Sequence, residues 1–210
     1  MMYRSDWVLK PNKYLSKDQA SRLLNVARSR AKQALAHDKK VPVRDFFIIH
    51  LALTTGLRVM EIAALHCSDI FLDDRICSIL VRKGKGGKKR LVFFTGPLRK
   101  HCRDYMRWKQ KTGESIEAEA PLLVSSNTGG HMTTRAIQKV FKRCAEKACL
   151  DSVYAIHCLR HTYACFLLKA SDWNLRLVQK QLGHSRISTT QVYADVMMPD
   201  VKKALDRLYR

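Results

Sequence analysis

The chain has 210 residues, a length that suits one domain or two small ones, and its 39 Lys and Arg against 18 Asp and Glu give a formal net charge of +21. Such a basic protein usually binds a polyanion: nucleic acid is the first candidate and an anionic membrane surface the second. No apolar run reaches the ~18 residues of a membrane-spanning helix, and the seven cysteines include no CxxC pair, which argues against a disulfide framework or a Cys-rich zinc site.

The predicted elements of the first third are helices. Ser16 and Gln19 form a capping-box pattern, and apolar residues at helical spacing continue the helix to Leu35. A second helix runs from about Pro42 to Gly56, and because it is apolar nearly all round we expect it at the centre of the fold. Residues 58–65 predict a short third helix.

The periodicity then changes to that of strands. Residues 75–82 and 89–94 predict two strands joined by the glycine-rich turn Lys-Gly-Lys-Gly-Gly-Lys at 83–88. A helix follows Pro97 to about Lys111, and then a loop over 112–132 with one short strand at 122–124. Further helices are predicted at 133–148, 157–170, 174–182, 188–196 and 199–209. The sequence therefore predicts a mostly helical domain with a small, basic β-sheet.

Basic residues concentrate around the glycine-rich turn. From Arg82 to Lys111 there are 12 Lys or Arg residues and a single acid, Asp104. A solvated surface would explain such a run. Four lysines between glycines also suit a hairpin tip that touches nucleic-acid phosphates, since glycine permits close approach of the backbone.

Four separated motifs each have an ordinary explanation. In TGLRVMEI, Arg58 can simply pair with Glu61 at a helix start. The lysines of the glycine-rich turn at 83–88 can simply lie in solvent. In HCLRH (157–161), a core histidine beside a surface arginine is the usual arrangement. In LGHS…STTQVY, a histidine follows a helix stop and precedes Tyr193 by nine residues, and tyrosine at helical spacing normally packs in a core.

Taken together and in this order, the segments TGLRVMEIAAL, VRKGKGGKKRLVFF, IHCLRHTYACFLL and LVQKQLGHSRISTTQVYADV resemble the boxes of the tyrosine recombinase (phage integrase) family, over about residues 15–196. The resemblance implies an α+β, mainly helical catalytic-domain fold with a small antiparallel β-sheet. It also implies a catalytic set consisting of Arg58, Lys85, His157, Arg160, His184 and the nucleophile Tyr193. The expected DNA-binding residues are Lys83, Lys88, Lys89, Arg90 and Arg135.

The chemistry of this family explains the residue types. Attack of a tyrosine oxygen on a DNA phosphodiester builds negative charge on the phosphate. The resemblance implies that Arg58, Arg160 and His184 stabilise this charge. The resemblance implies that His157 accepts the proton of Tyr193 and that Lys85 protonates the leaving 5′ oxygen. The product is a 3′-phosphotyrosine, so neither ATP nor a metal or other cofactor is needed. We expect Glu61 to orient Arg58 or a helix.

The resemblance implies a site-specific recombinase or integrase that cuts and rejoins double-stranded DNA in integration, excision or inversion. Expected partners are the DNA and sister protomers in a tetrameric synapse, since exchange of two duplexes needs four active sites, together with accessory DNA-bending proteins. We expect a cytoplasmic protein of a bacterium, phage or plasmid, with no membrane partner. A type IB topoisomerase and a catalytically idle DNA-binding remnant remain alternatives.

The domain organisation departs from the family in one respect. Family members typically carry an N-terminal core-binding domain, whereas here the catalytic domain begins almost at Met1. We expect one catalytic domain over 1–210, either as a minimal recombinase or as a truncated gene product. Its core covers about 15–196, and a helix within 197–210 docks on its own domain or, in trans, on a neighbouring protomer.

Overall fold

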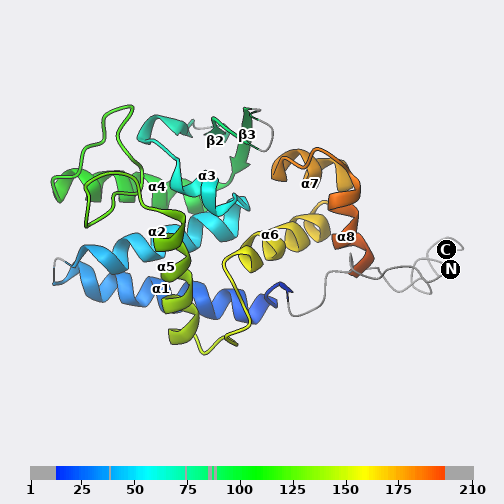
Figure 1. Ribbon diagram of the computed structural model, residues 1–210, viewed down its shortest axis with the longest axis horizontal. Coiled ribbons are helices and arrows are strands. Elements are labelled where there is room, and N and C mark those ends of the chain that lie inside the picture. The colour runs from blue at the N-terminus through cyan, green and yellow to red at the C-terminus, as the bar shows by residue number, and fades with distance from the viewer. Residues whose placement is uncertain (1–12, 38, 74, 85–86, 88, 197–210) are drawn as a thin grey trace, which may run out of the picture.

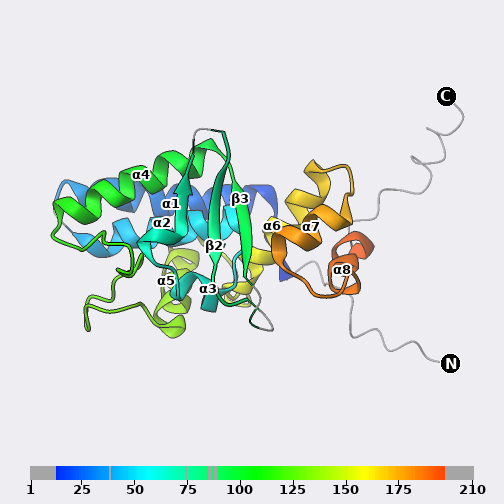
Figure 2. The same ribbon diagram turned by 90° about the horizontal axis from the view of Figure 1, so that it is seen from above.

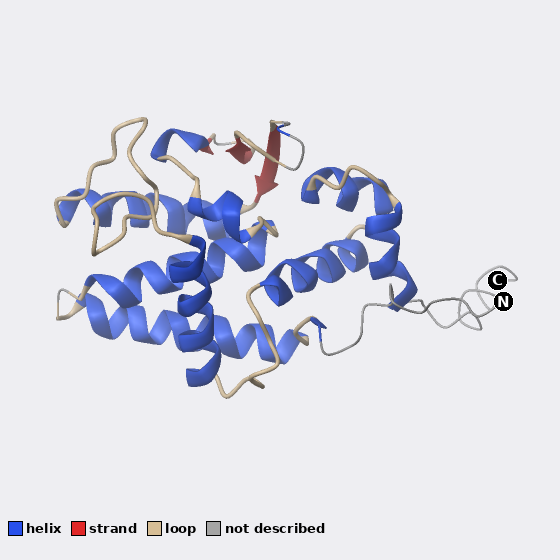
Figure 3. Cartoon of the chain, in the orientation of Figure 1, coloured by secondary structure: helices blue, strands red, loops and turns tan. Residues whose placement is uncertain are grey.

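The computed structural model describes residues 13–196 except 38, 74, 85, 86 and 88. The fold is mainly helical with one small sheet (Figures 1 and 3). The helices are α1 (Lys17–Leu35), α2 (Lys40–Thr55), α3 (Val59–Ala63), α4 (Gly96–Lys111), α5 (Thr134–Lys147), α6 (His157–Ala170), α7 (Leu175–Leu182) and α8 (Ser188–Val196). A 3₁₀ turn, η2 (Cys67–Asp69), precedes the strands β1 (Ile70–Leu72), β2 (Cys77–Val81) and β3 (Arg90–Phe94). The helix expected at 199–209 lies outside the described residues.

Helices α1 and α2 lie side by side and form the base of the structure (Figure 1). The capping box at the start of α1 is confirmed: the Ser16 amide donates to Gln19 Oε1 over 2.8 Å, and the Gln19 amide donates to Ser16 Oγ over 3.1 Å. The central position of α2 is confirmed as well, because the consecutive residues Phe47, Ile48 and Ile49, which point to different sides of the helix, are all fully buried. The helix begins at Lys40, so Pro42 stands inside its first turn.

The sheet is antiparallel with the strand order β1-β2-β3. Its inner face carries the directly opposed pair Ile79 and Val92, both fully buried, while Leu91 and Phe93 on β3 stay about half exposed. The strands stand at one edge of the helices in Figure 1 and pass in front of them in Figure 2.

Two details of the predicted sheet were wrong. Strand β1 was not predicted, because three residues are too few to show an alternating pattern. The strand expected at 122–124 does not form: within the described residues, Val124 makes only an isolated bridge with His131, and Leu122 and Leu123 are buried in a loop.

The apolar core has two parts. The larger part joins α1 to α5, the start of α6 and the sheet, and the smaller part lies between α6, α7 and α8. The two parts meet at Gly56, which ends α2 with a φ of 62°. A Cβ atom at Gly56 would overlap the ring of Tyr163 on α6 and approach Leu182 on α7, so only glycine allows these helices to converge.

A histidine pair lies between α2 and α4. The Nδ1 atoms of His50 and His101 are 2.8 Å apart, and both rings line a cavity of about 660 Å³ with Phe46 and Trp108. Burial, reinforced by the charge of Arg28, lowers the pKa of His50 to about 4. Burial, reinforced by the neighbouring His50, lowers the pKa of His101 to about 3. Both rings are therefore neutral at neutral pH.

This pair predicts acid sensitivity of the fold. Because both pKa values lie below the ordinary 6.5, the unfolded chain binds more protons, and stability is lost as pH falls from about 6.5 to about 4 for His50 and to about 3 for His101. Each ring contributes up to about 1.4 kcal/mol per pH unit in that window. Urea titrations at several pH values should show a shallower pH dependence for His101→Phe. The exposed His37→Phe is the control, and an unchanged slope for His101→Phe would contradict the assignment.

Candidate active site

Arg160 on α6 is a buried cation that joins the ends of two helices. Its Nη1 donates to the carbonyl oxygen of Gly56 at the end of α2, and its Nη2 donates to the carbonyl oxygen of Leu182 at the end of α7. Burial lowers the pKa of Arg160 to about 10, so the side chain is still charged at neutral pH. Among the described residues, no carboxylate forms an ion pair with this guanidinium. Its charge is therefore available to an incoming anion.

Arg58 lies beside this cation at the start of α3. Its backbone amide donates to Glu61 Oε2 over 2.8 Å, and its Nη1 donates to Glu61 Oε1 over 2.9 Å. Glu61 therefore orients Arg58 and caps the helix, as expected from the sequence.

The same carboxylate binds a second arginine. Arg90 at the start of β3 donates from Nη1 and Nη2 to the two oxygens of Glu61 over 2.8 and 2.9 Å. Burial by itself would raise the pKa of Glu61, but the hydrogen bonds from Arg90 and from the Arg58 amide, together with both charges, hold it below its usual value. One carboxylate thus serves two guanidiniums, and with Arg160 the site keeps an excess of positive charge.

Arg90 is held by a close approach of α7. Gly183 ends α7 with a φ of 67°, and a Cβ atom there would lie 2.6 Å from Arg90 Nε. Gln181 of α7 also bonds the backbone of Phe93 in β3, accepting from its amide over 3.2 Å and donating to its carbonyl over 2.6 Å. The prediction that Arg90 binds DNA stays a prediction, and the structure shows its side chain engaged with Glu61.

His184 follows the end of α7 and faces the same group. Its Nδ1 lies 3.0 Å from Thr190 Oγ1, a fully buried hydroxyl at the start of α8. Burial lowers the pKa of His184 to about 3, with further lowering by the charges of Arg160 and Arg58. The ring is thus neutral, next to two cations, and oriented by Thr190.

Tyr193 on α8 lies in the smaller core and is only 4% exposed. Its hydroxyl oxygen is 3.1 Å from Nδ1 of His161 on α6, and its ring stacks on His184 at a centroid distance of 6.3 Å. Burial raises the pKa of Tyr193 to about 12, although Arg160 acts in the opposite direction. Tyr193 is therefore a protonated phenol at neutral pH, and its neighbours include the His161 ring and the cation Arg160.

His157 stands at the start of α6, one helical turn before His161, and is exposed. It lines a surface cavity with Arg135, Lys139 and Lys142 of α5, so the predicted DNA-binding residue Arg135 lies on the same face of the molecule. Sequence reasoning missed His161 as the contact of Tyr193. The spacing of His157 and His161 by four residues on one helix face was the signal that would have found it.

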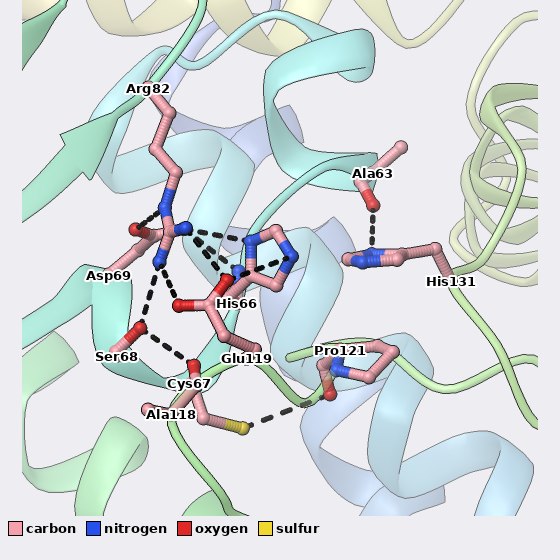
Figure 4. A network of polar contacts seen from close by, with 10 residues as sticks. All are labelled: Ala63, His66, Cys67, Ser68, Asp69, Arg82, Ala118, Glu119, Pro121 and His131. Carbon is pink, nitrogen blue, oxygen red and sulfur yellow. Dashed lines mark hydrogen bonds and ion pairs between the residues drawn. The ribbon is translucent and has the colours of Figure 1, made fainter.

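A polar cluster lies where the chain leaves β2 and enters the turn of the β2–β3 hairpin (Figure 4). Arg82, directly after β2, bonds Asp69 of η2 over 2.6 Å and Glu119 over 2.9 Å, and His66 and Ser68 complete the group. The cluster fastens one arm of the hairpin to η2 and to the loop that carries Glu119. Lys83 and Lys89 follow as exposed residues, while Lys85 and Lys88 lie outside the described residues.

The structure thus brings together five of the residues selected from the sequence: Arg58, Arg90, Arg160, His184 and Tyr193. Among the described residues, no group of three or more His, Cys, Asp or Glu side chains has the arrangement of a metal site. No helix of the described chain is long and apolar enough to cross a bilayer.

The sequence also matches a family model, described as the phage integrase family, over residues 13–199. The chain belongs to this family. Family membership and the mainly helical fold with a small antiparallel sheet confirm the resemblance on which the site residues were chosen. The roles of the individual residues remain predictions.

Several relatives are named tyrosine recombinases. The chain is 33% identical over 193 residues to tyrosine recombinase XerC of Xanthomonas campestris pv. campestris, covering 91% of this chain and 54% of the relative. It is 37% identical over 159 residues to tyrosine recombinase XerD of Ralstonia nicotianae, covering 76% and 50%. The chain therefore spans about half the length of the curated relatives it matches.

Solved structures agree on the fold. The crystal structure of XerA recombinase matches with a TM-score of 0.69 and 28% identity, over 93% of this chain and 63% of that one. XerH site-specific recombinase bound to palindromic difH substrate matches with a TM-score of 0.72 and 23% identity, over 94% and 53%. The second likeness concerns the fold alone.

The shared carboxylate predicts a large effect of one substitution. Glu61→Gln leaves two partly buried guanidiniums without a counter-charge, and we expect a loss of about 3–5 kcal/mol in the free energy of unfolding, measured with urea. The control is Asp104→Asn, which breaks an exposed pair with Lys100 and should cost less than about 1 kcal/mol. Equal effects of the two substitutions would show that Glu61 does not balance the site.

Proposed function

We propose that the chain cleaves and rejoins double-stranded DNA at specific sites through a 3′-phosphotyrosine formed by Tyr193, and that residues 1–210 act as its catalytic domain. The observation that carries this proposal is the position of Arg160: a buried guanidinium, without a carboxylate partner in the described chain, placed among Arg58, His184 and Tyr193. An anion is the natural occupant of such a site, and a phosphodiester is the anion that a tyrosine can attack.

In the proposed reaction the Tyr193 oxygen attacks the phosphorus, and the bond from phosphorus to the 5′ oxygen breaks. Negative charge grows on the two non-bridging oxygens, where Arg58 and Arg160 are the stabilising groups. His184 donates a further hydrogen bond. Glu61 keeps Arg58 in place before the DNA arrives, so the arginine needs no reorganisation during the reaction.

Lys85 is the proposed acid for the leaving 5′ oxygen. The hairpin that carries it also contributes Lys83, Lys88 and Lys89, whose charges suit phosphates on either side of the cleaved bond. Arg135 would extend this basic surface from α5. Rejoining reverses the same steps with a 5′-hydroxyl as nucleophile, so neither ATP nor a metal takes part.

The solved structures support DNA and further protomers as partners. XerH site-specific recombinase is bound to difH substrate, the Tn1549 transposon integrase is in complex with circular intermediate DNA, and a lambda integrase dimer is bound to a COC′ core site. We propose for this chain a synapse of four protomers, accessory DNA-bending proteins, and an exchanged helix from residues 197–210, in the cytoplasm of a bacterium.

The central test is covalent capture on a random-sequence pool of nicked duplexes, followed by denaturing electrophoresis and sequencing of the attached DNA. The chain should form a protein–DNA adduct, in excess EDTA as well, and the recovered sequences supply a substrate. Tyr193→Phe should form no adduct and bind that duplex with unchanged affinity. Tyr163→Phe is the control, because it removes a neighbouring phenol that bonds only Gln181 among the described residues. An adduct with Tyr193→Phe would refute the nucleophile.

A second test concerns Lys85. If this residue protonates the leaving oxygen, Lys85→Ala should cleave slowly on ordinary DNA and recover most of its rate when sulfur replaces the bridging 5′ oxygen. A thiolate leaves without help, since thiols have a pKa of roughly 8.5. Arg58→Ala should stay slow on both substrates. Equal defects of Lys85→Ala on both would remove it from the acid role, and recovery by Lys83→Ala would move the role to that residue.

An assay on supercoiled plasmid that carries two copies of the recovered site distinguishes a recombinase from the two alternatives. A recombinase exchanges or inverts the sites. A type IB topoisomerase activity relaxes the plasmid without exchange, and a catalytically idle remnant binds it without cutting.

A further inference from the structure

The second histidine of the HCLRH motif, His161, occupies the position that the chemistry assigns to the proton acceptor. Its Nδ1 lies 3.1 Å from the hydroxyl oxygen of Tyr193, within hydrogen-bond distance, and the two rings are tilted at a centroid distance of 5.7 Å. In the described residues, the structure records no other side-chain hydrogen bond to this hydroxyl. His157, the residue chosen from the resemblance, is exposed and makes no such contact.

The protonation states fit this role. Burial is the main reason that the pKa of His161 is lowered to about 4, and the nearby charges of His157, Arg160 and Lys13 lower it further. The ring is therefore neutral at neutral pH. The tyrosine is protonated, because burial raises its pKa to about 12. A phenol donates its only proton, and a neutral ring with hydrogen on Nε2 accepts it at Nδ1. In that tautomer the O–H of Tyr193 donates to Nδ1 of His161, and this is the arrangement that the proposal uses.

The His161 side chain also borders an open cavity that can take up the proton. The ring lines an open cavity of about 610 Å³ together with Lys13, Val153 and His157. The titratable and charged groups around it are Tyr193 from α8, His157 and Arg160 from its own helix, Lys13 from the segment before α1, and His184 from the turn after α7. A proton received from the buried tyrosine can pass from the ring to water in this cavity.

We propose that His161 is a catalytic residue that takes the proton of the Tyr193 hydroxyl during strand cleavage and returns it during rejoining. This inference rests on the proposed function. The O–H bond of Tyr193 breaks, its proton moves to Nδ1 of His161, and the oxygen electron pair forms the bond to phosphorus. The bond to the 5′ oxygen breaks, and that oxygen takes its proton from Lys85. The acidity of the phenol rises as its oxygen bonds phosphorus, so the transfer accompanies the attack.

The test is the rate of adduct formation in a single turnover, measured from pH 6 to pH 10 on the duplex recovered with the unmodified chain. His161→Gln keeps a polar side chain but removes the base, and we expect a rate about 10²–10⁴-fold lower at pH 7. The remaining rate should climb with pH, because hydroxide then takes over the proton. His157→Gln is the comparison variant, with the same change one helical turn away; whatever its rate, since His157 belongs to the catalytic set chosen from the resemblance, it should keep the pH dependence of the unmodified chain.

Added imidazole gives a second readout. His161→Gly opens space for the free base, so imidazole should restore its rate and leave His157→Gly unchanged. Circular dichroism and affinity for the same duplex establish that each variant folds. Should His161→Gln fail to fold, His161→Asn and the imidazole experiment carry the test.

Three results would overturn the inference. They are a normal rate in folded His161 variants, a lower rate with the original pH dependence and no imidazole rescue, or the rising pH profile in His157→Gln in place of His161→Gln. Absence of any adduct with the unmodified chain would instead refute the proposed function, so the two failures are distinguishable.

Discussion

The site depends on one buried guanidinium. Arg160 bonds the carbonyl oxygens of Gly56 and Leu182, which belong to the ends of α2 and α7. Carbonyl groups at a helix end lack partners inside the helix and carry partial negative charge, so two such ends compensate much of the cost of burying a cation. Within the part of the chain that the structure describes, they do so without a carboxylate, which would neutralise the charge. The protein thereby keeps a positive group, held by two hydrogen bonds, for the proposed phosphodiester substrate.

The same contacts position the remaining residues. Gly56 lies two residues before Arg58, and Leu182 lies two residues before His184, so each helix end that holds Arg160 leads directly into a site residue. The second helix end, Gly183, also holds Arg90 in place, and Arg90 shares Glu61 with Arg58. Displacement of one of these elements would therefore disturb the others. We infer that the arginines are set before the proposed DNA substrate binds, as electrostatic stabilisation of the proposed phosphoryl transfer requires.

Tyr193 is at once a core residue and the proposed nucleophile. It packs in the smaller core, as tyrosine at helical spacing usually does, and its hydroxyl contacts His161 beside the arginines. A phenol kept protonated by burial is a weak nucleophile until a base and a phosphate are both present. Burial of the tyrosine and the proposed base on α6 would together limit attack on unintended targets.

Much of this architecture was predictable from local pattern. The capping box at Ser16, the continuous apolar surface of α2 and the glycine stops at Gly56 and Gly183 are short-range signals, and the structure confirms each. The ordered motifs led to the family and to the residues of the site. Strand β1 and the loop at 122–124 escaped prediction because their conformation depends on neighbours distant in sequence, β2 for the strand and His131 for the loop.

The sequence by itself determined which chemical groups the protein has, in which order, and on which kind of element. Only the tertiary structure decided how they pair. Glu61 serves Arg90 from 29 residues away as well as Arg58, and Tyr193 contacts His161 in place of His157. Spacing along a helix specifies a face, but the position along α6 at which α8 packs selects which histidine on that face meets the tyrosine. That position results from packing of the whole smaller core, and no local pattern encodes it.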